Sequence, residues 1–250
     1  MFGTIVRILE SPLSPSHPDP PSARAPEDHS QRDTKERLLD AAERLFAERG
    51  FGGTSMRAVT QAADTSVSAA NYHFGSKEAL LQAALVRRLE PLNRQRLEAL
   101  DALETAAGDE PVAVETLLEA FLRPGYEAQR DAGDGRPPYR SIAARLYTDP
   151  HERVSSLKVE IFGPIIARFI DALAGALPNR TRDELVLDFQ FFIGLMIHVI
   201  SGLTRSEGEG EGPPPLPDEW VLQRMVSFAA AGLRAKSLTA RSGRDLGVVR

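Results

Sequence analysis

Apolar positions between residues 33 and 50 recur with the spacing of one amphipathic helix. This buried stripe consists of Leu38, Ala42, Leu45 and Phe46. Positions i, i+4, i+7 and i+8 share one face of a helix, so the pattern predicts a helix here. Asp33 and Glu36 have the spacing of an N-terminal capping box. Gly50 predicts a left-handed C-terminal cap.

Two shorter helices are predicted next. Thr54 or Ser55 caps the first, whose buried stripe is Met56, Val59 and Ala63. After the turn at Asp64, Ser66 is predicted to cap a second helix that ends at Phe74. This spacing is typical of a helix-turn-helix, whose second helix enters the major groove of DNA.

The remainder of the chain also has helical patterning. Ser76 is predicted to cap a long helix that runs to about Glu104, and Pro91 would kink it or split it. Further helices are expected over 111–129, 138–148, 151–177, 181–203 and 218–235. Pro164 would bend the 151–177 helix. Because no β alternation is evident, we predict an all-α fold.

The composition of the two termini and of one internal segment predicts irregular structure. Six prolines within residues 1–30 indicate a disordered tail, although a misassigned start codon explains this stretch equally well. Residues 206–217, SEGEGEGPPPLP, are low in complexity and predict a loop. The expected organisation is a tail over 1–30, a helix-turn-helix domain over 31–80, a helical body over 81–236 and a flexible tail over 237–250. The helix-turn-helix itself is expected at about 54–74.

Composition narrows the function classes. The 250 residues are 42% hydrophobic and 26% charged, as in ordinary soluble proteins. There is no cysteine, which excludes disulfides, thiolate metal sites and cysteine nucleophiles. The five histidines lack metal-ligand spacing, so we expect no metal and no cofactor. No apolar run reaches the roughly 18 residues of a membrane span, and no secretory signal is evident. A cytoplasmic protein is expected.

The net charge of −5 argues mildly against DNA binding, which needs basic residues. This net charge is an average over the whole chain, however. Whether the helix-turn-helix domain binds DNA therefore depends on the residues of that domain. The residues of that domain lie in the segment RLLDAAERLFAERGFGGTSMRAVTQAADTSVSAANYHFGSKEALLQAAL. It resembles the DNA-binding domain of the TetR family over about residues 35–85, most closely at AAERLFAERGF, TSMRAV and NYHFGSKEAL. The resemblance implies a homodimeric, all-helical transcriptional regulator with a short DNA-binding head and a larger ligand-binding body.

The resemblance also implies a palindromic double-stranded DNA operator, and repression as the commoner mode of action. Two positions depart from the family pattern. Asp64 stands where the family commonly has glycine, and Asp tolerates the left-handed conformation. Asn71 replaces a common aromatic residue, which shifts the expected phosphate contacts to Tyr72 and His73.

Candidate DNA contacts follow from the resemblance and from helix geometry. Ala70 and Phe74 should face the core. Arg57 could read guanine, Asn71 adenine, and Ala69 a thymine methyl group. The full candidate set is Thr54, Ser55, Arg57, Val67, Ser68, Ala69, Asn71, Tyr72, His73 and Lys77.

The body is expected to dimerise and to hold an effector. FQFFIGLMIHVISGL is apolar nearly all round, so its helix should be buried on several sides, either in a dimer or in the centre of a monomer. The stretch from Tyr139 to Pro178 resembles regulators that respond to lipophilic effectors, which implies an apolar ligand. Tyr139, Arg140, Arg145 and His198 are the polar candidates for the pocket. For Arg140 and Arg145 a solvated face is the favoured alternative, and His198 is expected in the interior. Pocket candidates are Phe121, Tyr126, Tyr139, Phe162, Phe169, Phe192, Met196 and His198.

Three other functional classes are alternatives to a transcriptional regulator. An enzyme is disfavoured because the sequence lacks G-x-S-x-G, H-E-x-x-H and glycine-rich nucleotide motifs. An architectural DNA-binding protein should be more basic. A helical protein-interaction adaptor that has lost DNA binding stays open because of the Asp64 carboxylate.

Overall fold

A computed structural model describes residues 29–128, 139–200 and 217–236, and all regular structure in these ranges is α-helical. The helices are α2 (His29–Arg49), α3 (Met56–Ala62), α4 (Val67–Phe74), α5 (Lys77–Ala107), α6 (Val114–Ala128), α7 (Tyr139–Thr148), α8 (Glu152–Ala176), α9 (Arg182–Ile200) and α10 (Asp218–Leu233). The all-α prediction is confirmed. The predictions for residues 1–28, 201–216 and 237–250 lie outside the described residues.

The predicted start of the first helix is wrong. Helix α2 already begins at His29, and Asp33 lies inside it, where its carboxylate pairs with Arg37 one turn later at 3.4 Å. The capping box is therefore not formed, because no residue between 29 and 33 stops the helix from extending upstream. The other end is as predicted. Gly50 has φ 71° and donates its N–H to the Phe46 carbonyl at 3.0 Å.

Serine caps define the three helices that follow. The hydroxyl oxygens of Ser55, Ser66 and Ser76 each accept the backbone N–H three residues on, at 3.1 Å. These bonds satisfy amide donors that have no partner within the helix. The Ser66 and Ser76 predictions are confirmed, and Ser55 rather than Thr54 caps α3.

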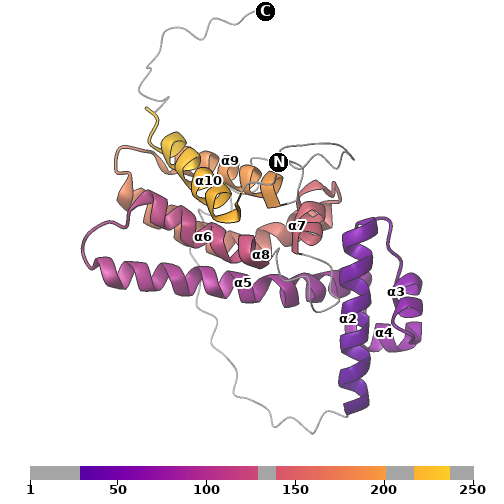
Figure 1. Cartoon of the computed structure of the whole chain (residues 1–250). Helices are drawn as coiled ribbons and strands as arrows, with labels where there is room; N and C mark the ends of the chain where they lie inside the picture. Colours follow the sequence, from indigo (N-terminus) through magenta and orange to yellow (C-terminus); the bar gives the residue numbers. More distant parts are fainter. Residues whose placement is uncertain (1–28, 129–138, 201–216, 237–250) are drawn as a thin grey trace, which may run out of the picture.

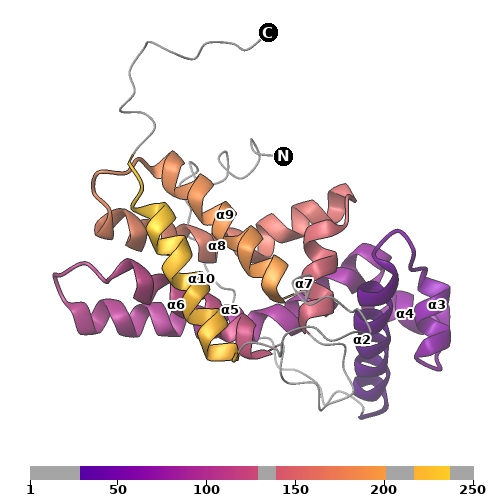
Figure 2. The same ribbon diagram turned by 45° about the horizontal axis from the view of Figure 1, so that its top comes forward.

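Helix α5 joins a small head, made of α2, α3 and α4, to the body (Figure 1). It is continuous across Pro91, whose ring lies on the exposed side of the helix, so Pro91 does not split it. The head lies at one end of the long α5 helix. Helices α6 and α8 pack along the length of α5, and α9 and α10 form a further layer beyond them (Figures 1 and 2). A movement of α5 would therefore displace residues of both the head and the body.

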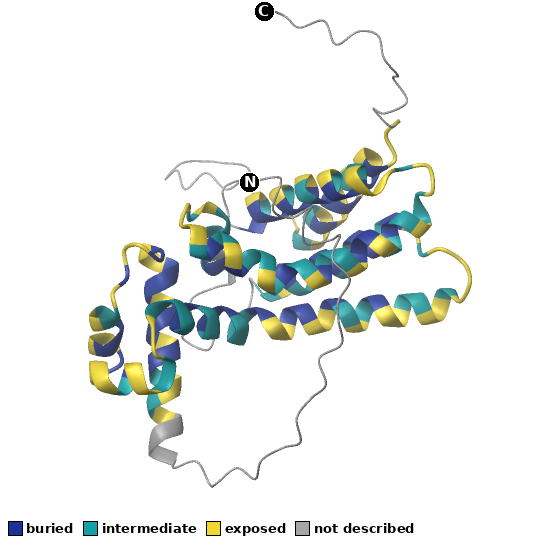
Figure 3. Cartoon of the chain, turned by 180° about the vertical axis from the view of Figure 1, so that it is seen from behind, coloured by how far each residue is buried: buried dark blue, intermediate teal, exposed yellow. Residues whose placement is uncertain are grey.

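The body closes around an aromatic cluster. Phe121 of α6, Phe169 of α8, and Phe189 and Phe192 of α9 have ring centroids 4.9 to 6.4 Å apart. All four side chains are buried, and buried residues gather on the inward sides of the helices (Figure 3). This close packing supplies the apolar core on which the body depends. No helix in the described ranges is long and apolar enough to cross a membrane.

Candidate nucleic-acid interface

The turn between α3 and α4 is held in a defined conformation. Asp64 adopts the left-handed φ of 49° that was expected there. Arg37 of α2 donates to the Asp64 carbonyl at 3.3 Å, and the Thr65 N–H donates to the Thr60 carbonyl at 2.9 Å. The three helices of the head are thereby fixed relative to one another.

Helix α4 presents one side to solvent. Ala70 is fully buried and Phe74 packs against the core, as expected. The opposite side exposes one apolar, two polar and one aromatic side chain, namely Val67, Ser68, Asn71 and Tyr72. Tyr72 is 75% exposed. Such a large exposed aromatic on a short helix is free to contact a partner.

Two half-buried residues lie at the edge of this side, namely Ala69 and His73. The His73 ring makes an edge-on contact with the Tyr72 ring, at 5.2 Å between centroids. On α3, Arg57 is exposed, and so is Gln61 one turn later. Gln61 was missed in the sequence, although its i+4 spacing from Arg57 places it on the same side.

Thr54 and Lys77 are corrections to the predicted set. Thr54 is 2% exposed, and its hydroxyl lies within hydrogen-bond distance of the carbonyls of Leu45 (3.1 Å) and Gly50 (2.8 Å). Lys77 donates to the carbonyls of Phe51 (3.0 Å) and Thr54 (3.1 Å), and its ammonium lies 3.9 Å from the Phe51 ring centroid. Both side chains hold the loop between α2 and α3, so neither is placed as a phosphate contact.

The head carries no excess of positive charge. Residues 29–80 contain seven basic and seven acidic side chains. A general electrostatic attraction to the phosphate backbone is therefore weak. Any DNA affinity of this head has to come from directed contacts of individual side chains and helix N-termini.

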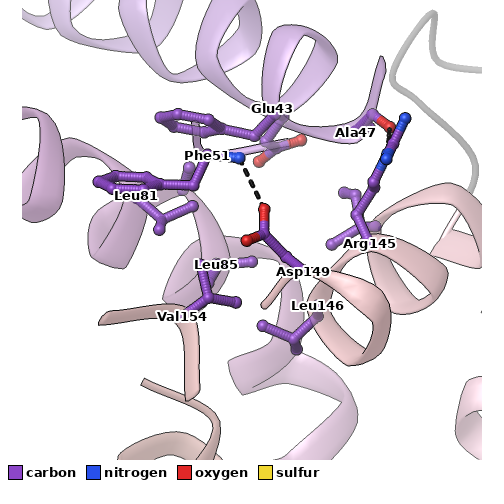
Figure 4. Close-up of a pocket in the computed structure, with 12 residues that line it drawn as sticks. Glu43, Ala47, Phe51, Leu81, Leu85, Arg145, Leu146, Asp149 and Val154 are labelled. Carbon is purple, nitrogen blue, oxygen red and sulfur yellow. Dashed lines mark hydrogen bonds between the residues drawn. The ribbon is translucent and has the colours of Figure 1, made fainter. Parts of the chain in front are cut away.

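The head is joined to the body by a second set of contacts besides α5. The Phe51 N–H donates to Asp149 Oδ2 at 2.9 Å (Figure 4). A Cβ on Gly50 would lie 2.9 Å from the same oxygen, and the φ of 71° at this position is one that favours glycine. Arg145 is exposed, but it is not merely solvated. It donates to the carbonyls of Ala47 (3.2 Å) and Glu48 (2.7 Å) in the last turn of α2.

A pocket lies at this junction, between α2, α5 and the α7–α8 segment. Its empty space, counted out to the solvent at its mouth, is about 410 Å³. Most of its surface is apolar, with charged side chains at Glu43, Arg145 and Asp149 (Figure 4). It is lined by Glu43, Phe46, Ala47, Phe51, Leu81, Ala84, Leu85, Ile142, Arg145, Leu146, Asp149 and Val154.

Of the described residues that were predicted to form an effector pocket, only Arg145, a polar candidate, lines this space. Phe121, Phe169 and Phe192 belong to the packed aromatic cluster. Three further candidates, Tyr126, Phe162 and Met196, are buried elsewhere in the body. The Tyr139 side chain lies outside the described residues.

His198 is exposed, so its predicted interior position is wrong. It lies on a side of α9 that is exposed to solvent. The residues that the sequence failed to indicate are Glu43 and Asp149. They are brought to one pocket by packing between parts of the chain more than 100 residues apart, which no local pattern records.

Helices α9 and α10 leave large apolar side chains in solvent. On α9 these are Leu187 and Phe191, the latter 62% exposed, one helical turn apart. On α10 they are Trp220 and Phe228, the latter 66% exposed. The described residues therefore do not cover α9 on all sides, which argues against the central core helix of a monomer.

Known proteins resemble both parts of the chain. Residues 38–84 match the family described as bacterial regulatory proteins, tetR family, and residues 119–232 match a tetracyclin repressor-like C-terminal domain. The HTH-type transcriptional regulator UidR of Escherichia coli K12 is 33% identical over 188 residues, covering 69% of this chain and 94% of UidR. The HTH-type transcriptional repressor KstR of Rhodococcus jostii RHA1 is 28% identical over 144 residues, covering 52% of this chain and 68% of KstR.

A similar fold is seen in the crystal structure of a protein from Pseudomonas aeruginosa PAO1 assigned as a transcriptional regulator. The two structures superpose with a TM-score of 0.58 over 83% of this chain and 92% of the other, at 18% identity. This likeness extends from the head through the body.

Proposed function

The chain belongs to the tetR family of bacterial regulatory proteins, and from this membership we propose that it reads a palindromic DNA operator through α4 and releases it when an effector binds. It is a DNA-binding, ligand-responsive transcriptional regulator. The proposal that α4 recognises the operator rests on the solvent-facing side of this helix. Tyr72 is 75% exposed there, and contacts within the head hold α4 in place.

Within this proposal the exposed side chains divide by chemistry. Asn71 faces adenine and Arg57 faces guanine, since an amide and a guanidinium can each make two hydrogen bonds to those bases. Val67 and Ala69 contact thymine methyl groups. Ser55, Ser68, Tyr72 and His73 contact phosphates and sugars, which fixes the register of the helix in the groove.

A homodimer would cover the apolar sides of α9 and α10. Phe191 of α9 and Phe228 of α10 are exposed, and these two helices are neighbours in the body (Figure 2). Two copies related by a two-fold axis would bury these side chains against their mates. The same axis would place two α4 helices one turn of DNA apart, which matches a palindromic operator.

The effector is proposed to be a small apolar molecule held in the body. The candidate residues are Phe121, Tyr126, Tyr139, Phe162, Phe169, Phe192 and Met196, which contribute aromatic and apolar groups. Because the cluster around Phe121 is closely packed, a ligand there has to displace rings and move the helices that carry them. Helix α5 would transmit that movement, and the equilibrium shifts toward a head spacing that fits DNA poorly.

Repression is supported by the name of the relative KstR, a transcriptional repressor. Release by a ligand then switches transcription on. A cytoplasmic location is part of the proposal, because a DNA operator is reached there, and the proposal includes no catalytic activity. An adaptor without DNA binding is not favoured, because the left-handed turn at Asp64 keeps the helix-turn-helix geometry.

The test is a selection of bound duplexes from a random library by the purified protein. The proposal expects enrichment of one palindromic sequence whose half-sites lie about one helical turn apart. The Tyr72→Ala variant, which leaves the head folded, should enrich it far less. Recovery of no common sequence by a folded dimer would overturn the operator proposal in favour of the adaptor.

A further inference from the structure

The junction pocket holds a buried charged oxygen that nothing in the described structure satisfies. Glu43 lies on α2, and its side chain is buried. Its Oε1 accepts a hydrogen bond from Arg87 Nε at 2.9 Å. Among the residues that the structure describes, no donor reaches its Oε2. A buried carboxylate oxygen without a donor is costly, so such an atom indicates a missing partner.

The local charge favours a cationic partner. Arg87 is shared among three carboxylates, because it also contacts Glu36 at 2.6 Å and Asp40 at 2.7 Å. Asp149 adds a further carboxylate to the pocket wall. In Figure 4 the Glu43 and Asp149 carboxylates point toward the same space. Arg145 also lines the pocket, but its guanidinium is directed to the carbonyls at the end of α2.

The rest of the wall is apolar. Leu81 and Leu85 come from α5, and Leu146 and Val154 from the α7–α8 region (Figure 4). A ligand of matching chemistry has one positively charged hydrogen-bond donor and a short hydrocarbon part.

We propose that the pocket between head and body is a binding site for a small organic cation, an alkylammonium group, whose ammonium donates to Glu43 Oε2. This site is distinct from the effector site proposed in the body. Its occupant would touch α2 of the head and Asp149 of the body at once. It would therefore tie the position of the head to the presence of the cation.

Binding is tested without DNA, so its result does not depend on operator recognition. Methyl-labelled protein is titrated with n-butylammonium chloride, with n-butanol as the uncharged analogue and NaCl to match ionic strength. The methyl resonances of Leu81, Leu85, Leu146 and Val154 are followed. We expect saturable shifts with n-butylammonium, and at least about tenfold weaker binding of n-butanol.

Glu43→Gln should weaken n-butylammonium binding by at least about tenfold, since the amide carries no charge. Glu36→Gln is the matched control, because it removes another partner of Arg87 that does not line the pocket, and it should bind like the unaltered protein. Methyl resonances of Leu117 and Leu118 in the body report whether each variant is folded. If Glu43→Gln does not fold, the comparison of the two probes on the unaltered protein decides. Equal binding of both probes, or no saturable shift with n-butylammonium, would overturn the proposal.

Discussion

The backbone N–H of Phe51 donates a 2.9 Å hydrogen bond to Oδ2 of Asp149, 98 residues further along the chain. Phe51 lies just after α2 of the head, and Asp149 follows α7 of the body. The same carboxylate accepts the N–H of His151 through Oδ1 at 3.0 Å, which orients it. The head is therefore fixed to the body by a contact with the segment after α7, in addition to its covalent link through α5.

Replacing Asp149 by alanine should loosen this connection. A hydrogen bond to a charged acceptor contributes about 1.5–3 kcal/mol, so Asp149→Ala should lower the free energy of unfolding by about that amount. The Phe51 amide should exchange its hydrogen with solvent much faster. Asp149→Asn keeps an oxygen acceptor and should lose less. Unchanged exchange at Phe51 in Asp149→Ala would show that the contact does not hold the head.

Substitutions of Thr54 distinguish two roles for this residue, namely stabilising the loop between α2 and α3 and contacting DNA. In Thr54→Val the buried hydroxyl is lost and the carbonyls that it faces lose a donor, which should destabilise the protein by about 1–3 kcal/mol. Thr54→Ser retains the hydroxyl and should be milder. DNA affinity of the folded Thr54→Val protein should not change. A stable variant that has lost DNA binding would return Thr54 to the set of DNA contacts.

The apolar sides of α9 and α10 predict the oligomeric state. Phe191→Asp and Phe228→Asp each place a carboxylate where a symmetric partner should bury an aromatic ring. Dimer affinity should fall by about 100-fold or more, measured by sedimentation equilibrium. Gln95→Asp, on the exposed side of α5, is the control and should remain dimeric. Dimers of undiminished affinity in both phenylalanine variants would place the interface elsewhere.

The ion pair between Glu115 of α6 and Arg234, just after α10, predicts a small pH dependence. Hydrogen bonds from Arg234 lower the pKa of Glu115 from 4.5 to about 2. A lowered pKa in the folded state adds stability above pH 4.5, and this contribution is lost as the pH falls from 4.5 toward 2. The two side chains are 45% and 46% exposed, so solvent screening limits the contribution to less than about 1 kcal/mol.

Glu115→Gln reports this contribution directly. The free energy of unfolding of the variant should be slightly lower than that of the unaltered protein at pH 7, and equal to it near pH 2. Added salt should reduce the difference at pH 7. A difference of the same size at both pH values would assign the effect to packing instead of charge.

Local features of the fold were predictable because they depend on a few adjacent residues. The serine caps, the glycine at position 50 and the left-handed Asp64 all follow from short-range hydrogen bonds and backbone sterics. Asp33 was misassigned because a capping box describes a possible helix start, but does not show that the helix cannot extend upstream. The exposed side of α4 followed from helical spacing once Ala70 was assigned to the core.

The junction was not predictable because its contacts are non-local. The roles of Thr54 and Lys77 depend on carbonyls that converge only when the loop after α2 is folded. Asp149 is one acidic residue among many in the sequence, and its contact with Phe51 depends on how α7 packs against α2. His198 was assigned to the interior because an apolar helix indicates burial, but does not tell whether the same chain or a partner covers it.

The central claim, that α4 and α3 read a specific operator, is tested most directly by one affinity comparison. Fluorescence anisotropy would measure binding of the purified protein, and of Arg57→Ala, to the selected palindromic duplex and to a scrambled duplex of the same composition. The account predicts at least about 1,000-fold preference for the palindrome, reduced about 10- to 100-fold in Arg57→Ala with stability unchanged. Equal affinity of the folded protein for both duplexes would contradict it.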